Sequence, residues 1–234
     1  MSNIFKTRST DQDESHWLSV SDLMAGLMVV FLFIAIALMR NAIIERNQIK
    51  DVAIAYQENQ LAIYNALTEE FKIDLKRWDA TINQDSLTFI FNSPDILFKT
   101  GKTQLNAQYK VLLKDFFPRY IDVLSPFKNS ISEVRIEGHT SSVWNIGTSD
   151  TDAYFFNMKL SQGRTRSVLE YIYGLDAVAP QKSWINRHIA AVGFSSSRNI
   201  LDGDGNEDRD RSKRVSFRVI TNADIKIKQI LESK

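Results

Sequence analysis

The chain has 234 residues, enough for one domain of ordinary size and an appended element. Its 29 basic and 28 acidic side chains nearly cancel, which argues against a general nucleic-acid binder, because such proteins usually carry a basic excess. Without cysteine, the chain forms no disulfide, thiolate metal site or cysteine nucleophile, and its three histidines lie too far apart to give a metal-ligand pattern.

The first apolar run of membrane length covers residues 17–39 and reads WLSVSDLMAGLMVVFLFIAIALM. Its uncharged part, residues 23–39, forms roughly 25 Å of helix, and the stretch from Trp17 extends it past the roughly 30 Å hydrocarbon core of a bilayer. A secretory signal peptide has an apolar core of only about 7–15 residues followed by a small-x-small cleavage site, whereas this run continues as MRNAIIER. We therefore predict a retained single-span helix over residues 17–40 after a tail at residues 1–16, with a buried soluble helix as the alternative.

The run carries one acid, Asp22, and no Lys or Arg within it provides a counter-charge. An acid at the centre of a membrane span costs about 2.5–3.5 kcal/mol, and less near an interface. Two interpretations remain open. Asp22 either caps the helix within SVSDL, or it is an ionisable group that faces protein and takes up and releases a cation. The small residues Ala25 and Gly26 would let a neighbouring helix approach closely.

Residues 41–80 are predicted to continue as an amphipathic connecting helix, because they contain no Gly or Pro and are rich in Ala, Glu, Gln, Lys and Ile. We expect their apolar stripe either to form a short parallel coiled coil between two copies, which we favour, or to pack on the domain that follows. The stripe recurs at spacings of three and four and consists of Leu61, Tyr64, Leu67, Phe71, Leu75 and Trp78.

The remaining chain has the pattern of an α/β sandwich with the order βαβαββ, over residues 81–222, before a tail at residues 223–234. Segments of alternating β-formers predict strands, and two long amphipathic segments predict helices. The predicted strands are residues 86–92, 131–140, 188–197 and 213–222, and the predicted helices are residues 106–124 and 156–175.

Five segments of this domain carry a family resemblance: ILFKTG, VRIEGHT, NMKLSQGRTRSV, VGFSSS and DRSKRVSFRV. Together they look like the OmpA-like peptidoglycan-binding domain, whose pattern has Gly-His-Thr-Asp after a strand, Asn-x-x-Leu-Ser-x-x-Arg on a helix and Asn-Arg-Arg before the last strand. Joined to a preceding span with an early acid, the layout resembles the B subunits of ion-driven stator units of the MotB type. Among these it is most similar to the B subunits of the Zorya anti-phage systems.

The resemblance implies a peptidoglycan-anchored B subunit of an ion-driven, more specifically proton-driven, motor in anti-phage defence. It implies a single-pass protein of the bacterial inner membrane, with the N-terminus in the cytoplasm and the large domain in the periplasm, although the charges flanking the span do not decide this orientation. The implied partners are a second copy of the chain, a polytopic A-type subunit, expected to be a pentamer, and peptidoglycan. Asp22 would carry the translocated H⁺ or Na⁺, and no other cofactor is implied. A flagellar-type stator B subunit and a passive membrane-to-wall tether without ion flux stay open as alternatives.

In the family, the acid after Gly-His-Thr and the helix Arg hold the zwitterionic end of diaminopimelate in the stem peptide. A planar guanidinium suits a carboxylate, and an acid suits an ammonium. Here Ser141 stands where the family has Asp, so Asp150 or Asp152 becomes the candidate for the negative charge. The peptidoglycan-binding residues that the resemblance implies are Thr140, Ser141, Phe156, Asn157, Leu160 and Arg164.

Simpler structural interpretations accompany these residues. Gly138 is expected to serve the turn after its strand and Leu160 to belong to the core, while an ordinary surface ion pair stays open as the alternative for Arg164. In LDGDGNEDRDR, acids and Asn alternate as at the start of a calcium loop, but the sixth and twelfth positions hold Glu207 and Lys213 in place of Gly and Glu. We therefore expect a solvated acidic turn and no metal site. The chain shows no enzyme motif and no Gly-rich phosphate loop, so we predict a non-enzyme that does not bind nucleic acid.

Overall fold

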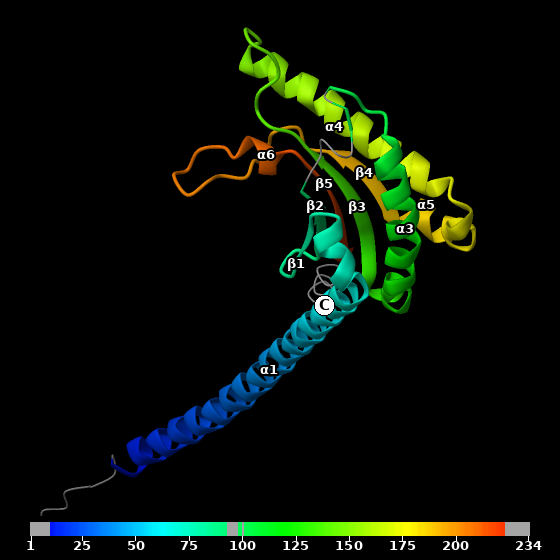
Figure 1. The fold of residues 1–234 in the computed structure, drawn as a ribbon. Helices are drawn as coiled ribbons and strands as arrows, with labels where there is room; N and C mark the ends of the chain where they lie inside the picture. The colour runs from blue at the N-terminus through cyan, green and yellow to red at the C-terminus, as the bar shows by residue number, and fades with distance from the viewer. Residues whose placement is uncertain (1–9, 93–97, 100, 223–234) are drawn as a thin grey trace, which may run out of the picture.

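The computed structural model describes residues 10–92, 98–99 and 101–222, with side chains from Val20 onward. Figure 1 shows one long helix that leads into an α/β domain. The predicted tail at residues 223–234, the first nine residues and the side chain of Trp17 lie outside this description. Along the chain the elements are α1 (Thr10–Arg77), β1 (Ala80–Asn83), β2 (Thr88–Phe91), α3 (Ala107–Leu124), the 3-10 helix η1 (Ser125–Ser130), β3 (Ile131–His139), α4 (Asp150–Tyr173), the 3-10 helix η2 (Asp176–Gln181), α5 (Lys182–His188), β4 (Ile189–Gly193), α6 (Arg209–Ser212) and β5 (Arg214–Thr221).

The domain is built on a five-stranded sheet with the order β1-β2-β5-β3-β4. β3 and β4 are parallel and are connected through α4, whereas the other neighbours are antiparallel. Helices α3 and α4 cover one face of the sheet (Figure 1). The predicted fold class, a mixed α/β domain preceded by a long apolar helix, is confirmed.

Two elements differ from the sequence prediction. β1 was not predicted, because it is a four-residue strand that begins directly after the helix, where Asp79 turns the chain with a φ of 46°. α4 begins at Asp150, six residues before the predicted start, because Ser149 is its N-cap and accepts a hydrogen bond from the Asp152 backbone N–H. The residues before Phe156 are therefore the first turns of a helix and not an extended insertion.

Aromatic rings fill the space between the helices and the sheet. Phe116 of α3 lies at the centre, with ring centroids 4.7 Å from Phe89, 5.2 Å from Phe91 and 5.1 Å from Phe217. Phe71 of α1 joins the same cluster, with its centroid 5.3 Å from those of Phe89 and Phe116. The last turns of α1 are therefore part of the domain's core and do not merely connect to it.

The apolar stripe of α1 is accordingly taken up by the chain's own domain. Ile63, Leu67 and Phe71 are fully buried there, whereas Leu61 is half-exposed. Because these three side chains are buried in their own domain, they cannot form a coiled coil with a second copy. At these positions the stripe packs on the following domain, which was the less favoured of the two expectations. The helical spacing was correct, but it does not distinguish a partner helix from the chain's own sheet and helices.

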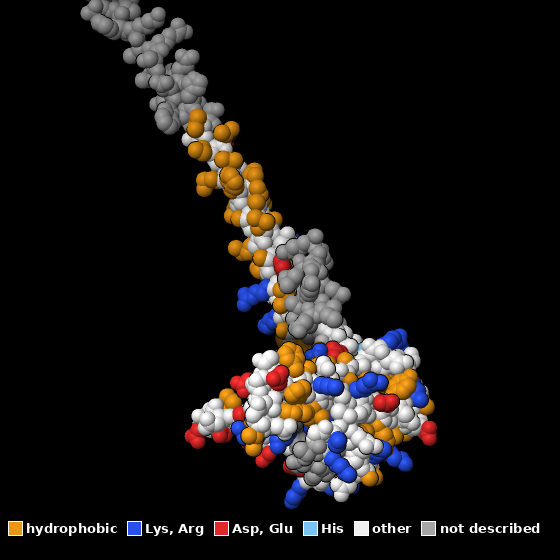
Figure 2. Space-filling model, turned by 90° about the horizontal axis from the view of Figure 1, so that it is seen from above, with side chains coloured by type: hydrophobic (Ala, Val, Ile, Leu, Met, Phe, Trp, Pro, Cys, Tyr) orange, Lys and Arg blue, Asp and Glu red, His pale blue; other side chains and the backbone are white. Residues whose placement is uncertain are grey.

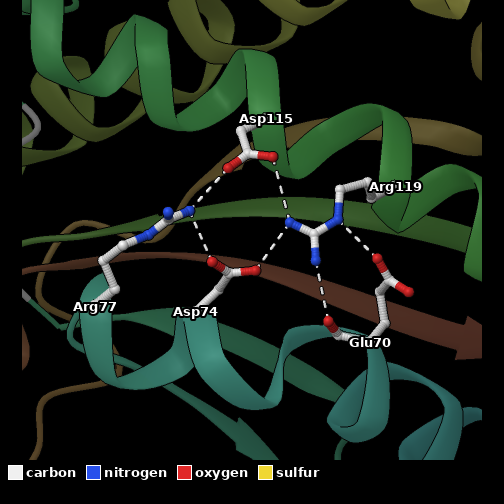
Figure 3. A network of polar contacts seen from close by, with 5 residues as sticks. All are labelled: Glu70, Asp74, Arg77, Asp115 and Arg119. Atoms are coloured by element: carbon white, nitrogen blue, oxygen red, sulfur yellow. Dashed lines mark hydrogen bonds and ion pairs between the residues drawn. The ribbon is translucent and has the colours of Figure 1, made fainter.

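A polar network fixes α1 to α3 beside these apolar contacts (Figure 3). Arg119 donates to Glu70 at 2.7 Å and to Asp74 at 2.8 Å, while Arg77 lies 2.7 Å from Asp74 and 2.8 Å from Asp115. Partial burial works against the charge of Arg119, but its carboxylate partners outweigh burial and raise its pKa. Because two arginines alternate with the carboxylates of both helices, the network resists sliding and rotation of α1 against α3.

Candidate functional site

The N-terminal part of α1 is long and apolar enough to cross a membrane. The candidate span Val20–Arg77 contains an 18-residue window with a mean hydropathy of 2.5, and none of that window is buried in the protein. Every residue from 27 to 34 is exposed, so apolar side chains point in all directions around the helix, as Figure 2 shows for one side. A helix that is apolar all round needs lipid or partner helices to cover it.

Asp22 lies near the start of this apolar stretch, and its side chain is exposed in the single chain. Ala25 and Gly26 follow at positions i+3 and i+4, so they share its helical face, and a Cβ added at Gly26 would meet nothing within 4 Å. The carboxylate therefore stands on a small-residue face that another helix can approach. Ile63, where α1 first becomes fully buried in the domain, is about 60 Å further along the helix at 1.5 Å per residue.

A second group of predicted residues meets where β3 ends and α4 passes over it. Thr140 and Ser141 follow β3 and are nearly buried, and the Thr140 N–H donates to the Ser195 carbonyl at 2.9 Å. Asn157 is 2% exposed, and its Nδ2 donates to the Ser141 carbonyl at 3.0 Å. Asn157 therefore holds the loop after β3 in place, which makes it a positioning residue for this site.

Arg164 lies two helical turns beyond Asn157 on the same face of α4, because i and i+7 align in an α-helix. It is 7% exposed, its Nε donates to the Lys102 carbonyl at 3.1 Å, and its guanidinium carbon lies 4.8 Å above the ring of Phe98. These contacts identify Arg164 as an oriented, nearly buried cation. At 7% exposure Arg164 is not the surface residue of the simpler interpretation.

The remaining two predicted residues are on other parts of the helix surface. Leu160 is half-buried. Phe156 is 47% exposed and packs its ring against Trp144, with centroids 5.5 Å apart. Phe156 and Trp144 together form an aromatic wall at the N-terminal end of α4, beside the loop that Asn157 supports.

Two glycines bring α4 close to the strand ends. A Cβ at Gly138 would lie 2.8 Å from the Ser161 carbonyl oxygen, and one at Gly193 would lie 2.4 Å from the backbone nitrogen of Gln162. Gly138 is inside β3, so the expectation that it serves the turn after the strand is wrong. Its missing side chain instead allows helix and sheet to approach, which places Asn157 and Arg164 beside the end of β3.

Asp152 accepts a hydrogen bond from Ser149 Oγ at 2.7 Å within the helix cap, and the helical rise places it roughly 18 Å along α4 from Arg164. A different acid, Glu207, contacts the loop after Ser141. Its Oε1 accepts from the Ser142 N–H at 2.9 Å, and its Oε2 accepts from the Ser142 hydroxyl.

Sequence reasoning missed Glu207, which belongs to the acidic turn and is 65 residues from Ser142. The turn folds on itself, because Asp202 Oδ1 accepts from the backbone N–H groups of Asp204 and Asn206. No group of three or more potential metal ligands occurs among the residues that the structure describes. The acidic turn positions the Glu207 carboxylate against Ser142, the residue after Ser141.

Comparisons with known proteins agree with this architecture. The model of the OmpA family matches residues 97–213. The Zorya protein ZorB of Escherichia coli is 53% identical over 222 residues, which cover 95% of this chain and 94% of that protein.

Among solved structures, a putative MotB like protein from Desulfovibrio vulgaris has a TM-score of 0.50 at 20% identity, over 74% of this chain and 94% of its own. The cell wall anchor of the T6SS from Pseudomonas aeruginosa has a TM-score of 0.45 at 21% identity, over 66% and 96%. At such identities the former shows the fold alone. The resemblance inferred from the sequence motifs is confirmed by the family model and by the relative that matches nearly the whole chain: the chain belongs to the ZorB family and carries an OmpA-family domain.

Proposed function

We propose that the chain is the peptidoglycan-anchored B subunit of an ion-driven membrane motor of the Zorya type, with Asp22 as the ion-carrying carboxylate. The observation that carries this proposal is the position of Asp22, the one acid of an apolar run on a helix that enters the wall-binding domain without a break. The 53% identity to ZorB favours a role in defence over a flagellar one.

In this proposal, α1 crosses the inner membrane with its N-terminus in the cytoplasm and the domain in the periplasm. Two copies lie inside a ring of polytopic A-type subunits, expected to be a pentamer, which covers the apolar surface that the single chain leaves exposed. A cation, H⁺ in preference to Na⁺, neutralises Asp22 and changes the contact between helix and ring. A potential of 100 mV supplies about 2.3 kcal/mol for each charge moved across the membrane, enough for a modest step.

The domain holds the pair of B chains still by binding peptidoglycan at the end of β3. Arg164 binds the carboxylate of a diaminopimelate end group, and Glu207, in place of the family's Asp at position 141, binds its ammonium. Thr140 and Ser141 form the floor between them, and Phe156 lines the wall. Asn157 and Leu160 position the loop and the helix that carry these groups.

Asp22→Asn tests the membrane half of the proposal. The substitution keeps the shape of the side chain but removes its charge, so we expect loss of phage protection in cells with unchanged protein level and unchanged assembly. Asp51→Asn, at an exposed acid of the same helix outside the apolar run, is the matched control and should protect normally. Protection that survives Asp22→Asn would support the passive tether and exclude ion transfer through this residue.

Glu207→Gln tests the wall half. The amide oxygen can still accept from the Ser142 N–H and the amide nitrogen can donate to its hydroxyl oxygen, but the neutral side chain cannot attract an ammonium, so co-sedimentation with purified sacculi should weaken about tenfold. Arg164→Ala should weaken it similarly, whereas Arg166→Ala, at an exposed residue of the same helix, should not. Thermal unfolding of each variant separates lost binding from lost folding. Sacculus binding unchanged in Glu207→Gln would remove Glu207 from the site.

A further inference from the structure

The face of the sheet opposite α4 carries a polar cavity that the proposed wall site does not use. Side chains alternate along a strand, so Ile136 and Phe217 point into the core while Glu137 and its cross-strand partner Ser216 point to the other face. A cavity of about 190 Å³ opens there. Its lining includes Thr88, Glu137, His139, Arg198, Arg214 and Arg218.

Two of these side chains are buried without adequate hydrogen bonds. Glu137 and His139 are 4% and 3% exposed. His139 Nε2 lies 3.4 Å from Glu137 Oε2 without the geometry of a hydrogen bond, and neither ring nitrogen nor Glu137 Oε1 has a hydrogen-bond partner among the described residues. Buried polar atoms are nearly always paired with protein or a bound group, so these atoms are available to pair with a group that enters the cavity.

The three arginines of the cavity share one acidic partner. Arg214 donates to the carbonyls of Ser212 and Arg198 at 3.0 and 3.1 Å. These hydrogen bonds orient the guanidinium group, but the carbonyls carry no negative charge to balance it. Arg198 lies 3.8 Å over the ring of Phe194, and its Nη1 is 3.7 Å from Glu137 Oε1. Arg218 makes no hydrogen bond or ion pair through its side chain within the described part of the chain.

Among the described residues that line the cavity, Glu137 is the one acid, so two positive charges of the lining remain unbalanced when His139 is neutral. Burial lowers the pKa of Arg214, and burial together with the nearby arginines lowers the pKa of His139. Burial acts to raise the pKa of Glu137, but His139 and the arginines outweigh it and lower that pKa. The cations therefore repel one another and would be stabilised by an added anion.

We propose that this cavity binds a phosphate group between Arg198, Arg214 and Arg218, with His139 as a further donor. Guanidinium forks match the oxygens of phosphate, and a dianion matches the two unbalanced charges better than a carboxylate does. The cavity lies across the sheet from Arg164, so phosphate binding is independent of the proposed wall site and of the motor function. Arg218 would contribute its charge to the ligand, because its side chain makes no hydrogen bond or ion pair with the described residues.

The test uses the full chain in neutral detergent, with inorganic phosphate titrated against sodium chloride of equal ionic strength. Phosphate should raise the thermal unfolding midpoint in a saturable way, because a ligand that binds the native state stabilises it. Arg218→Gln should weaken phosphate binding at least about tenfold, whereas Arg211→Gln, at an exposed arginine of α6, should leave it unchanged. Equal affinity in Arg218→Gln and the unsubstituted chain would overturn the proposal.

Glu137→Gln gives a prediction of opposite sign. Removing the one acid from the lining should tighten phosphate binding, an effect that a purely structural role of Glu137 would not produce. Phosphate should also raise the pKa of His139, measured by NMR of the ¹³C-labelled imidazole; an unchanged pKa would contradict contact with His139.

Three further soluble ligands identify the source of the phosphate group. Glycerol 3-phosphate represents a monoester, glycerophosphoglycerol represents the diester of a lipid headgroup, and acetate represents a carboxylate. Binding of the monoester supports a soluble phosphate ligand, and binding of the diester supports a lipid or polymer ligand. Acetate binding as tightly as phosphate, or a midpoint that responds to ionic strength alone, would refute the phosphate site.

Discussion

Replacing Phe71 with Ala tests whether the end of α1 is part of the folded domain. The ring is fully buried, lies 5.3 Å from the rings of Phe89 and Phe116, and has the guanidinium of Arg119 4.8 Å above it. Truncation of a buried Phe costs about 3–5 kcal/mol, and the lost cation–π contact adds about 0.5–1 kcal/mol. At about 2–4 °C per kcal/mol for a domain of this size, the unfolding midpoint should fall by roughly 7–24 °C.

The assay is thermal unfolding of the full chain in neutral detergent, followed by tryptophan fluorescence, which includes Trp78 at the edge of the same aromatic cluster. Ile73→Ala is the matched control, because Ile73 lies on the same helix but is 84% exposed. The control should change stability by no more than about 0.5 kcal/mol. If Phe71→Ala were as mild as Ile73→Ala, α1 would be a linker to an independently stable domain, and the inference of a shared core would be refuted.

Two further predictions concern the sheet. Gly193→Ala should destabilise by about 1–3 kcal/mol or more, because the new Cβ would lie 2.4 Å from a backbone atom of α4; Gly203→Ala, where a Cβ meets nothing within 4 Å, should be neutral in the same melting assay. Burial lowers the pKa of His139 below its ordinary 6.5, so the unfolded chain binds more protons and stability falls as the pH drops through and below that value. In His139→Gln, the urea unfolding midpoint should fall less between about pH 7.5 and pH 5.5 than it does in the unsubstituted chain. This window lies above the ordinary pKa of Glu137, so the titration of that acid does not interfere. An equally steep fall in the variant would contradict the assignment of the decline to His139.

The periodicity of apolar residues and the helix caps predicted most of the helices and strands, and each element that was missed or misplaced has a cause in its own short segment. α3 begins within one residue of its expected start, because Asn106 is a strong N-cap whose side chain accepts from the Tyr109 N–H at 2.7 Å. α4 was predicted to start too late, although the Ser149 and Asp152 pair of a capping box was present in the sequence. β1 is too short for alternation to distinguish it from the end of the preceding helix.

The candidate site was only partly accessible to sequence reasoning. Motif spacing identified Arg164 and the loop after β3, because both lie in contiguous segments that one motif covers. Glu207 was missed, since its contact with Ser142 depends on how the acidic turn folds back over 65 residues. The cavity around Glu137 and His139 was missed for the same reason, because four separate segments supply its lining.

The continuity of α1 favours one of the two mechanical interpretations of the proposed function. From Asp22 to Ile63 the helix rises about 60 Å, roughly twice the hydrocarbon thickness of a bilayer, and it contains no Pro. Its far end is fixed by the buried Phe71 and by the network around Arg119, so a rotation applied near Asp22 is not absorbed at a hinge before the domain. A passive tether needs only length and would work equally well with a flexible joint. A stator, as proposed, needs a stiff connection between Asp22 and the domain that would bind the wall, and the unbroken helix between them supports that proposal.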